Sequence, residues 1–162
     1  MISPDDFRRV LGHFASGVTI VTTVDAGGRP TGLTASAFTS VSLEPPLILV
    51  CVAHTSQSYP ALLASGRFAV NFLREDQQEA SRRFSTSKIE STAKFDGVPY
   101  RLGTLGLPLL DEALAYVECV TANRHDEGDH TVFIGRVEAC GTTDGAPLLY
   151  FRGKYASLPP GP

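Results

Sequence analysis

The stretches of this chain that suit β-strands follow one another with few residues between them, and this spacing constrains the fold more than any other feature. Residues 18–24 are β-branched, and residues 47–53 form a continuous apolar run. The intervals 25–30, 43–46 and 123–130 are too short for the crossover helix that joins parallel neighbours. The sequence therefore predicts a mainly antiparallel barrel and argues against a doubly wound dinucleotide-binding domain.

Glycine and proline divide the chain into short elements. About seven strands are expected, over residues 18–24, 31–42, 47–53, 68–73, 113–122, 131–140 and 148–155. Short helices are expected after Ser3 with an end at Gly17, over 59–65 and over 75–84. The segment 85–110 is expected to be irregular, because Gly97, Pro99, Gly103, Gly106 and Pro108 interrupt it.

Charge and hydropathy exclude several classes of partner. The 162 residues suit a single domain over 1–162, and a net charge of −3 leaves no broad basic field for nucleic acid or an anionic membrane. The longest apolar run, residues 45–53, is about half of the roughly 18 residues that indicate a membrane-spanning helix. The charged N-terminal segment lacks the apolar core of a secretion signal, so the cytoplasm is the expected location.

The cysteines and histidines do not form a metal site pattern. Cys51, Cys119 and Cys140 are odd in number, widely spaced and embedded in apolar stretches. They are expected to be reduced packing residues rather than disulfides or zinc ligands. His125 and His130 make a poor metal pair without evident further ligands, so no metal centre is expected.

Stereotyped catalytic motifs are missing from the sequence, which contains no dinucleotide-binding glycine fingerprint, Walker loop, nucleophile elbow or zinc-protease motif. Residues 32–40 instead concentrate small and hydroxyl side chains without a charge. A flat heteroaromatic ligand could lie close to the backbone there, although a strand with solvent-facing Thr and Ser explains the same pattern.

Two further segments have the chemistry of ligand contacts. Residues 54–58 precede a short helix, where backbone N–H groups and hydroxyls could hold a phosphate, with Arg82 or Arg83 as a guanidinium partner. Helix capping is the commoner role of such hydroxyls, and compensation of the helix dipole explains the two arginines equally well. His130 follows Asp129 at the start of a strand, which is a common place for a ligand contact and also for a merely solvated imidazole.

Five segments together resemble the short-chain flavin reductase family over nearly the whole chain. They are Phe14-Ala15-Ser16-Gly17-Val18-Thr19-Ile20-Val21-Thr22-Thr23, Gly32-Leu33-Thr34-Ala35-Ser36-Ala37-Phe38-Thr39-Ser40-Val41-Ser42, Pro45-Pro46-Leu47, Gly128-Asp129-His130 and Tyr150-Phe151-Arg152-Gly153-Lys154-Tyr155. Each segment alone is weak evidence, but their order and spacing are specific. Two departures are Ala37, where the family often has a small polar residue, and His54, where a basic residue is frequent.

The resemblance implies an FMN-binding split β-barrel, Greek-key-like, with a few peripheral helices. It implies a homodimer that reduces FMN or FAD with NADH or NADPH and supplies reduced flavin to a separate monooxygenase. The cofactors then perform the chemistry, so no catalytic side chain is expected. A flavin carrier or sensor without turnover, or a related barrel acting on another substrate, are the alternatives.

The resemblance also implies which residues contact the cofactors. The isoalloxazine segment is Thr34, Ala35, Ser36 and Ser40, the neighbouring strand is Val50, Cys51 and Val52, and the phosphate site is Thr55 and Ser56. A second cofactor-facing segment is Arg83 and Phe84, the nicotinamide contact is His130, and the adjoining C-terminal strand is Tyr150, Phe151, Arg152 and Gly153.

Overall fold

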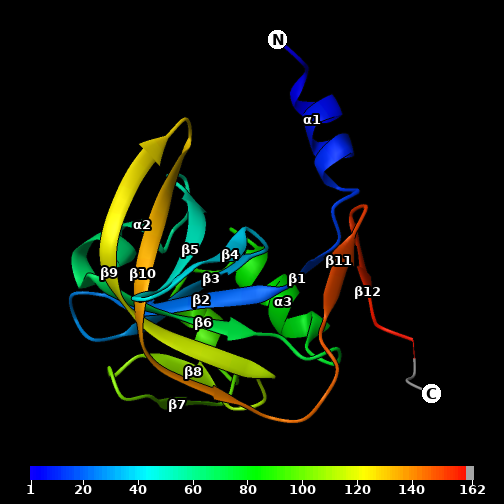
Figure 1. The fold of residues 1–162 in the computed structure, drawn as a ribbon. Helices are drawn as coiled ribbons and strands as arrows, with labels where there is room; N and C mark the ends of the chain where they lie inside the picture. Colours follow the sequence, from blue (N-terminus) through cyan, green and yellow to red (C-terminus); the bar gives the residue numbers. More distant parts are fainter. Residues whose placement is uncertain (160–162) are drawn as a thin grey trace.

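The structure is a computed structural model that describes residues 1–159 and consists mainly of antiparallel strands (Figure 1). The helical elements are α1 (Pro4–Leu11), α2 (Tyr59–Ser65), α3 (Gln78–Ser85) and the 3-10 turn η1 (Ala93–Phe95). The strands are β1 (Ser16–Gly17), β2 (Thr19–Val24), β3 (Pro30–Ala35), β4 (Phe38–Leu43), β5 (Pro46–Ala53), β6 (Arg67–Phe72), β7 (Tyr100–Leu102), β8 (Pro108–Leu110), β9 (Ala115–Glu127), β10 (His130–Thr142), β11 (Leu149–Phe151) and β12 (Lys154–Ala156). The predicted mainly β class with short helices is confirmed. Within this described part, no helix is long and apolar enough to cross a membrane.

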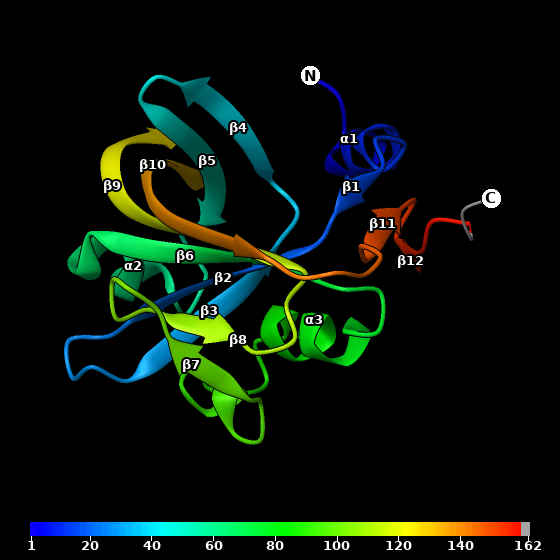
Figure 2. The same cartoon turned by 60° about the horizontal axis from the view of Figure 1, so that its bottom comes forward.

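Seven strands form one curled sheet in the order β3-β2-β6-β9-β10-β5-β4. Its two edge strands, β3 and β4, follow each other in the chain but pair with β2 and β5, so the barrel is split between them. Figure 2 shows β4 and β5 arching away from β2 and β3. Smaller sheets are formed by β1, β11 and β12 and by β7 and β8.

Alternation along the strands builds the core of the barrel. On β5, Ile48, Val50 and Val52 are buried, while the residues between them are half-exposed. The buried side chains pack with Phe68 of β6 and Phe133 of β10. Gly135 permits this packing at a bulge, because a Cβ there would lie 2.7 Å from Cζ of Phe68.

Helix α1 begins as predicted but ends earlier. Ser3 caps it by accepting a hydrogen bond from the Asp6 amide at 3.0 Å. The helix ends at Leu11 with Gly12 as its C-cap, so the predicted end at Gly17 is wrong. Gly17 lies in β1, where the chain pairs with Leu149 of β11.

Four strand predictions also differ from the structure. Residues 31–42 are two strands rather than one, because β3 and β4 pair with different partners on either side of residues 36–37. Residues 148–155 contain a hairpin that turns at Arg152 and Gly153, both at positive φ. The predicted strand 113–122 starts two residues before β9, and the predicted strand 131–140 lies within β10. Both observed strands have 13 residues and pair along their whole length.

The segment 85–110 is more ordered than predicted. It contains η1 and the β7–β8 hairpin, whose register pairs Tyr100 with Leu110. Leu107 and Leu109 are buried against Ala69 of β6, so tertiary packing orders a segment that its glycines and prolines made look irregular in the sequence.

The cysteine prediction is wrong for one residue, since Cys140 is exposed, whereas Cys119 is buried and Cys51 half-buried.

Candidate functional site

The start of the candidate site is the end of β3. Thr34 is half-buried, and its hydroxyl donates to the Ser81 carbonyl of α3 at 2.7 Å. The Ala35 side chain belongs to the barrel core, whereas Ser36 is exposed. Ser40 of β4 is exposed too, but it pairs with Ile48 and therefore lies on the opposite face of the sheet from Cys51. Of this predicted segment, Thr34 and Ser36 present polar groups at the end of β3.

The three predicted site residues of β5 point to opposite faces of the strand. Val50 and Val52 point into the core and are fully buried, so only their backbone could contact a ligand. Cys51 lies on the outer face, and burial raises the pKa of its thiol. Its amide donates to the Ala37 carbonyl at 3.1 Å, which places Ala37 beside it. Cys51 is therefore the predicted residue of β5 whose side chain faces outward.

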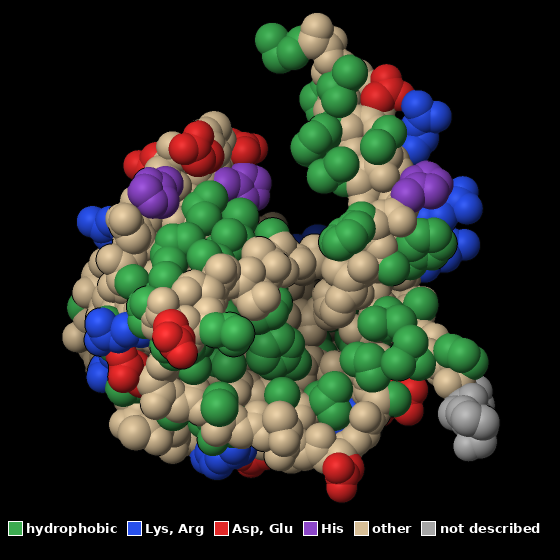
Figure 3. All heavy atoms as spheres, viewed as in Figure 1, with side chains coloured by type: hydrophobic (Ala, Val, Ile, Leu, Met, Phe, Trp, Pro, Cys, Tyr) green, Lys and Arg blue, Asp and Glu red, His purple; other side chains and the backbone are tan. Residues whose placement is uncertain are grey.

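Cross-strand pairing extends this outer face into a flat, uncharged surface. Cys51 pairs with Val132 of β10, and Ala53 pairs with His130. Because paired residues share a face of a sheet, Cys51, Ala53 and Val132 form what we call the platform, with His130 at its margin. His125 of β9 pairs with Val132 and adjoins the platform on the far side. Figure 3 shows hydrophobic side chains gathered below the histidines near the tip of the β9–β10 hairpin.

His130 is held by its neighbour in the turn. Its Nδ1 lies 2.7 Å from Oδ1 of Asp129, and this hydrogen bond lowers the pKa of the Asp129 carboxyl. The bond leaves Nε2 of His130 free to meet a ligand. Among residues 1–159, no group of three His, Cys, Asp or Glu residues could hold a metal ion.

The loop of residues 54–58 joins β5 to α2, but its helix start offers fewer free donors than the sequence indicated. The Ser56 amide donates to Ala53, the Tyr59 amide donates to Ser56, and Pro60 has no N–H. The Ser58 hydroxyl donates to the Gly32 carbonyl at 2.9 Å and does not cap the helix. Thr55 is exposed and Ser56 half-exposed, so their hydroxyls are accessible to a ligand.

Arg83 and Phe84 are occupied by packing within α3 and η1. The Arg83 guanidinium donates through Nε to the Lys94 carbonyl at 2.6 Å and through Nη2 to the Ala93 carbonyl at 2.9 Å. Phe84 is buried and meets Phe95 edge-on, with ring centroids 4.9 Å apart. Nζ of Lys94 donates a hydrogen bond to the Phe84 carbonyl, and burial lowers the pKa of this amine. These contacts hold the end of α3 in place and leave both hydrogens of Nη1 and one of Nη2 on Arg83 for a further partner.

The C-terminal hairpin of β11 and β12 is connected to the end of β3 by hydrogen bonds through α3. Tyr155 of β12 donates to the Ser81 hydroxyl at 2.8 Å, and the Ser81 carbonyl is the acceptor for Thr34. Tyr150 and Phe151 are partly exposed at the hairpin, whose turn is Arg152 and Gly153. Ser81 and Tyr155 were missed as connecting residues, because no sequence pattern indicates hydrogen bonds between segments so distant.

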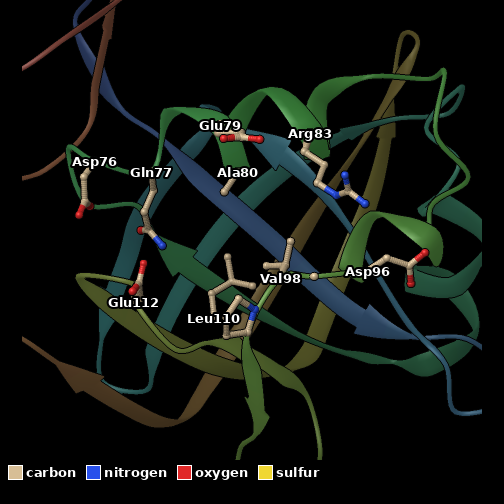
Figure 4. A pocket seen from close by; sticks show the side chains of 11 residues that line it. Asp76, Gln77, Glu79, Ala80, Arg83, Asp96, Val98, Leu110 and Glu112 are labelled. Atoms are coloured by element: carbon tan, nitrogen blue, oxygen red, sulfur yellow. The ribbon is translucent and has the colours of Figure 1, made fainter.

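A separate cavity of about 360 Å³ lies between α3 and residues 96–99 (Figure 4). Its apolar wall includes Val98 and Leu110, and its rim carries the carboxylates of Asp76, Glu79, Asp96 and Glu112. Arg83 is the one predicted site residue that lines it. Four carboxylates disfavour an anion, so this cavity does not suit the phosphate of a flavin or of a nicotinamide nucleotide.

Comparisons with known proteins agree with this architecture. The model of the flavin reductase like domain matches residues 11–159. The reductase subunit HsaB of a flavin-dependent monooxygenase from Mycobacterium tuberculosis is 42% identical over 162 residues, covering 98% of this chain and 84% of HsaB. An NADH-dependent flavin reductase from a Rhodococcus species is 38% identical over 159 residues, covering 97% and 88% of the two chains. The solved structure of the NADH:FAD oxidoreductase SgcE6 from Streptomyces globisporus, in complex with NAD and FAD fragments, has a TM-score of 0.89 and 36% identity, covering 99% and 97%.

The chain therefore belongs to the flavin reductase-like family. It is a flavin reductase with the split-barrel fold, which confirms the family resemblance seen in the sequence.

Proposed function

We propose that this chain reduces FAD or FMN with NADH, with the flavin ring on the platform and the nicotinamide approaching from the side of His130. The observation that carries this proposal is the outward row of Cys51, Ala53 and Val132, uncharged and half-exposed between the 54–58 loop and His130. A surface of small neutral side chains fits a planar heteroaromatic ring. The names of SgcE6 and of the Rhodococcus relative support NADH as the donor and FAD as one acceptor.

The chain contributes binding and orientation to the reaction. A hydride passes from nicotinamide C4 to flavin N5 when both are bound, which requires these atoms to approach within about 3–3.5 Å. The platform excludes water from one face of the flavin ring and leaves the other face open to the nicotinamide. His130 orients the nucleotide through Nε2, while Asp129 holds its Nδ1. Thr55 and Ser56 donate hydrogen bonds to the flavin phosphate.

Steady-state turnover tests this function directly. NADH oxidation is measured with FAD, FMN and riboflavin at equal concentration, and then with NADPH in place of NADH. Sustained oxidation of NADH that depends on added flavin is the expected result. Tight flavin binding without turnover would instead identify a carrier or sensor, and turnover only with another reducible substrate would identify a related flavoenzyme.

His130→Ala should reduce kcat/KM for NADH by about threefold to tenfold, because loss of one polar contact costs about 0.5–1.5 kcal/mol. The dissociation constant of the flavin should change little. Arg124→Ala is a suitable control, since Arg124 pairs with Phe133 and lies on the other face of the hairpin. If flavin affinity falls while the kinetics of NADH at saturating flavin stay unchanged, His130 contacts the flavin instead.

The proposal includes a homodimer, because α1 presents an apolar side that its own chain does not cover. None of the α1 residues is buried, and Phe7, Val10, Leu11 and Phe14 remain exposed. Figure 3 shows hydrophobic side chains along the side of α1 that faces the barrel across an open gap. A second copy would remove this surface from water.

The proposal also includes a cytoplasmic location and transfer of reduced flavin to a separate monooxygenase, as the name of HsaB suggests.

Light scattering at micromolar concentration should give about twice the chain mass of 17.3 kDa. Leu11→Glu combined with Phe14→Glu should shift the mass toward the single chain, because two carboxylates would enter an apolar contact. Arg8→Ala on the polar side of α1 is the control and should keep the wild-type mass. A wild-type mass near 17 kDa would contradict the dimer.

A further inference from the structure

A buried hydroxyl links the β9–β10 hairpin, which carries His130, to the 54–58 loop at the other end of the proposed cofactor site. Thr131 of β10 is 0% exposed, and its Oγ1 lies 2.5 Å from Oδ1 of Asp126, 2.8 Å from the hydroxyl of Tyr59 and 3.1 Å from Nε2 of His54. We call these four residues the Thr131 cluster. Tyr59 and His54 also stack at a tilt with ring centroids 5.2 Å apart, and Tyr59 meets Phe133 of the core edge-on at 6.2 Å.

The hydrogen-bonding capacity of one hydroxyl assigns the direction of each bond. A threonine hydroxyl donates one hydrogen and accepts at two lone pairs, whereas an ionised carboxylate only accepts. Thr131 therefore donates to Asp126 and accepts from the Tyr59 hydroxyl and from Nε2–H of His54. All three bonding positions of the hydroxyl are occupied, so no substitution of Thr131 other than serine can reproduce them.

The cluster joins segments that are far apart in the chain. Asp126 belongs to β9, His54 follows β5, and Tyr59 begins α2, so the cluster connects both strands of the hairpin to the 54–58 loop. The His54 amide adds a backbone bond to the Asp129 carbonyl at 3.0 Å. Thr131 and His130 are adjacent and point to opposite faces of β10, with Thr131 toward the barrel interior and His130 toward the platform side.

We infer that Thr131 is a positioning residue that fixes His130 relative to the 54–58 loop, so that nucleotide and flavin phosphate are held in one geometry. The inference rests on the proposed function for the roles of His130 and this loop. Without the cluster, only backbone bonds, such as the one from the His54 amide to the Asp129 carbonyl, would hold the hairpin tip to the loop, and the two would be held less firmly. Binding of both cofactors would then weaken together. The loss of a residue that contacts only one cofactor would weaken the binding of that cofactor alone.

The test compares Thr131→Val, which keeps the size of the side chain and removes the hydroxyl, with Thr131→Ser, which keeps the hydroxyl. Thr22→Val is the matched control, because Thr22 is also 0% exposed and bonds through its hydroxyl to the Pro108 carbonyl and the Asn71 amide, away from the cluster. His54→Phe is a second, milder variant that keeps ring packing on Tyr59 and removes one donor. Hydrogen–deuterium exchange of residues 54–58 and 123–130 is measured without cofactors, beside KM for NADH and Kd for flavin.

Thr131→Val should raise both KM for NADH and flavin Kd by about threefold to tenfold, as expected for loss of one to two buried hydrogen bonds, and speed exchange in both segments. Thr131→Ser should restore values within about twofold of wild type, and His54→Phe should shift them in the same direction as Thr131→Val by about threefold or less. Unchanged exchange in both segments, or an equal rise of KM and Kd in Thr22→Val, would overturn the inference. If wild-type protein oxidises no NADH, the proposed function fails, while the exchange measurement still decides whether Thr131 couples the two segments.

Discussion

Ser56→Glu should weaken the binding of FMN by about 10- to 100-fold while the fold survives. Ser56 is half-exposed in the loop between β5 and α2, and its hydroxyl accepts from the Ser58 amide at 3.4 Å. A glutamate there brings a negative charge beside the proposed phosphate position. Two like charges about 6 Å apart repel by roughly 3 kcal/mol at an effective dielectric of about 20, and salt reduces this in part.

The controls separate charge from shape. Ser56→Gln has the same length as the glutamate without its charge and should lose much less FMN affinity. Riboflavin lacks the phosphate, so its affinity for Ser56→Glu should stay near the wild-type value. Fluorescence quenching of each flavin measures these constants. An equal loss for riboflavin and FMN, or wild-type FMN affinity in the glutamate variant, would place the phosphate elsewhere.

Glu118→Ala should lower the free energy of unfolding by about 2–4 kcal/mol. Glu118 of β9 is 0% exposed, and its carboxylate accepts from the amides of Thr104 and Leu105, both at 2.8 Å. Gly103 leaves room for this carboxylate, since a Cβ there would lie 2.5 Å from its atoms. Removal of the carboxylate would leave two amides without their acceptor and a void below the 103–105 loop.

The same variant distinguishes a structural carboxylate from a catalytic one. Urea unfolding measures the stability loss, and flavin Kd and kcat at a temperature where the variant is folded should match wild type. Glu138→Ala is the control, because Glu138 pairs with Arg136 at the surface at 2.6 Å and exposed ion pairs contribute about 0–1 kcal/mol. A loss of kcat in Glu118→Ala without a loss of stability would contradict the structural role.

The antiparallel class could be predicted because it depends on local spacing. Intervals such as 25–30 cannot hold a crossover helix, and the structure indeed joins β2 to β3 by a tight hairpin there. Strand ends were predicted less well, because they depend on partners. Residues 31–42 read as one β-rich stretch, yet the chain changes partner strand at residues 36–37.

Candidate site residues were found through the family resemblance, but their side-chain directions were not. Val50, Cys51 and Val52 are adjacent in sequence, and only the pairing of β5 with β10 shows that the valines face the core and Cys51 faces outward. Arg83 illustrates the same limit. Its guanidinium is bonded to carbonyls of residues 93 and 94, a contact that no periodicity indicates.

The sequence by itself determined the antiparallel fold class, the approximate strands and the family, because these follow from local spacing and from motifs in order. Only the tertiary structure decided which side chains form the platform and which hydrogen bonds couple the β9–β10 hairpin to the 54–58 loop. The hydroxyl of Thr131 meets His54 and Tyr59 across 77 and 72 positions of the chain. Contacts of that range arise when the sheet closes, and a pattern read along the chain contains information only about neighbours.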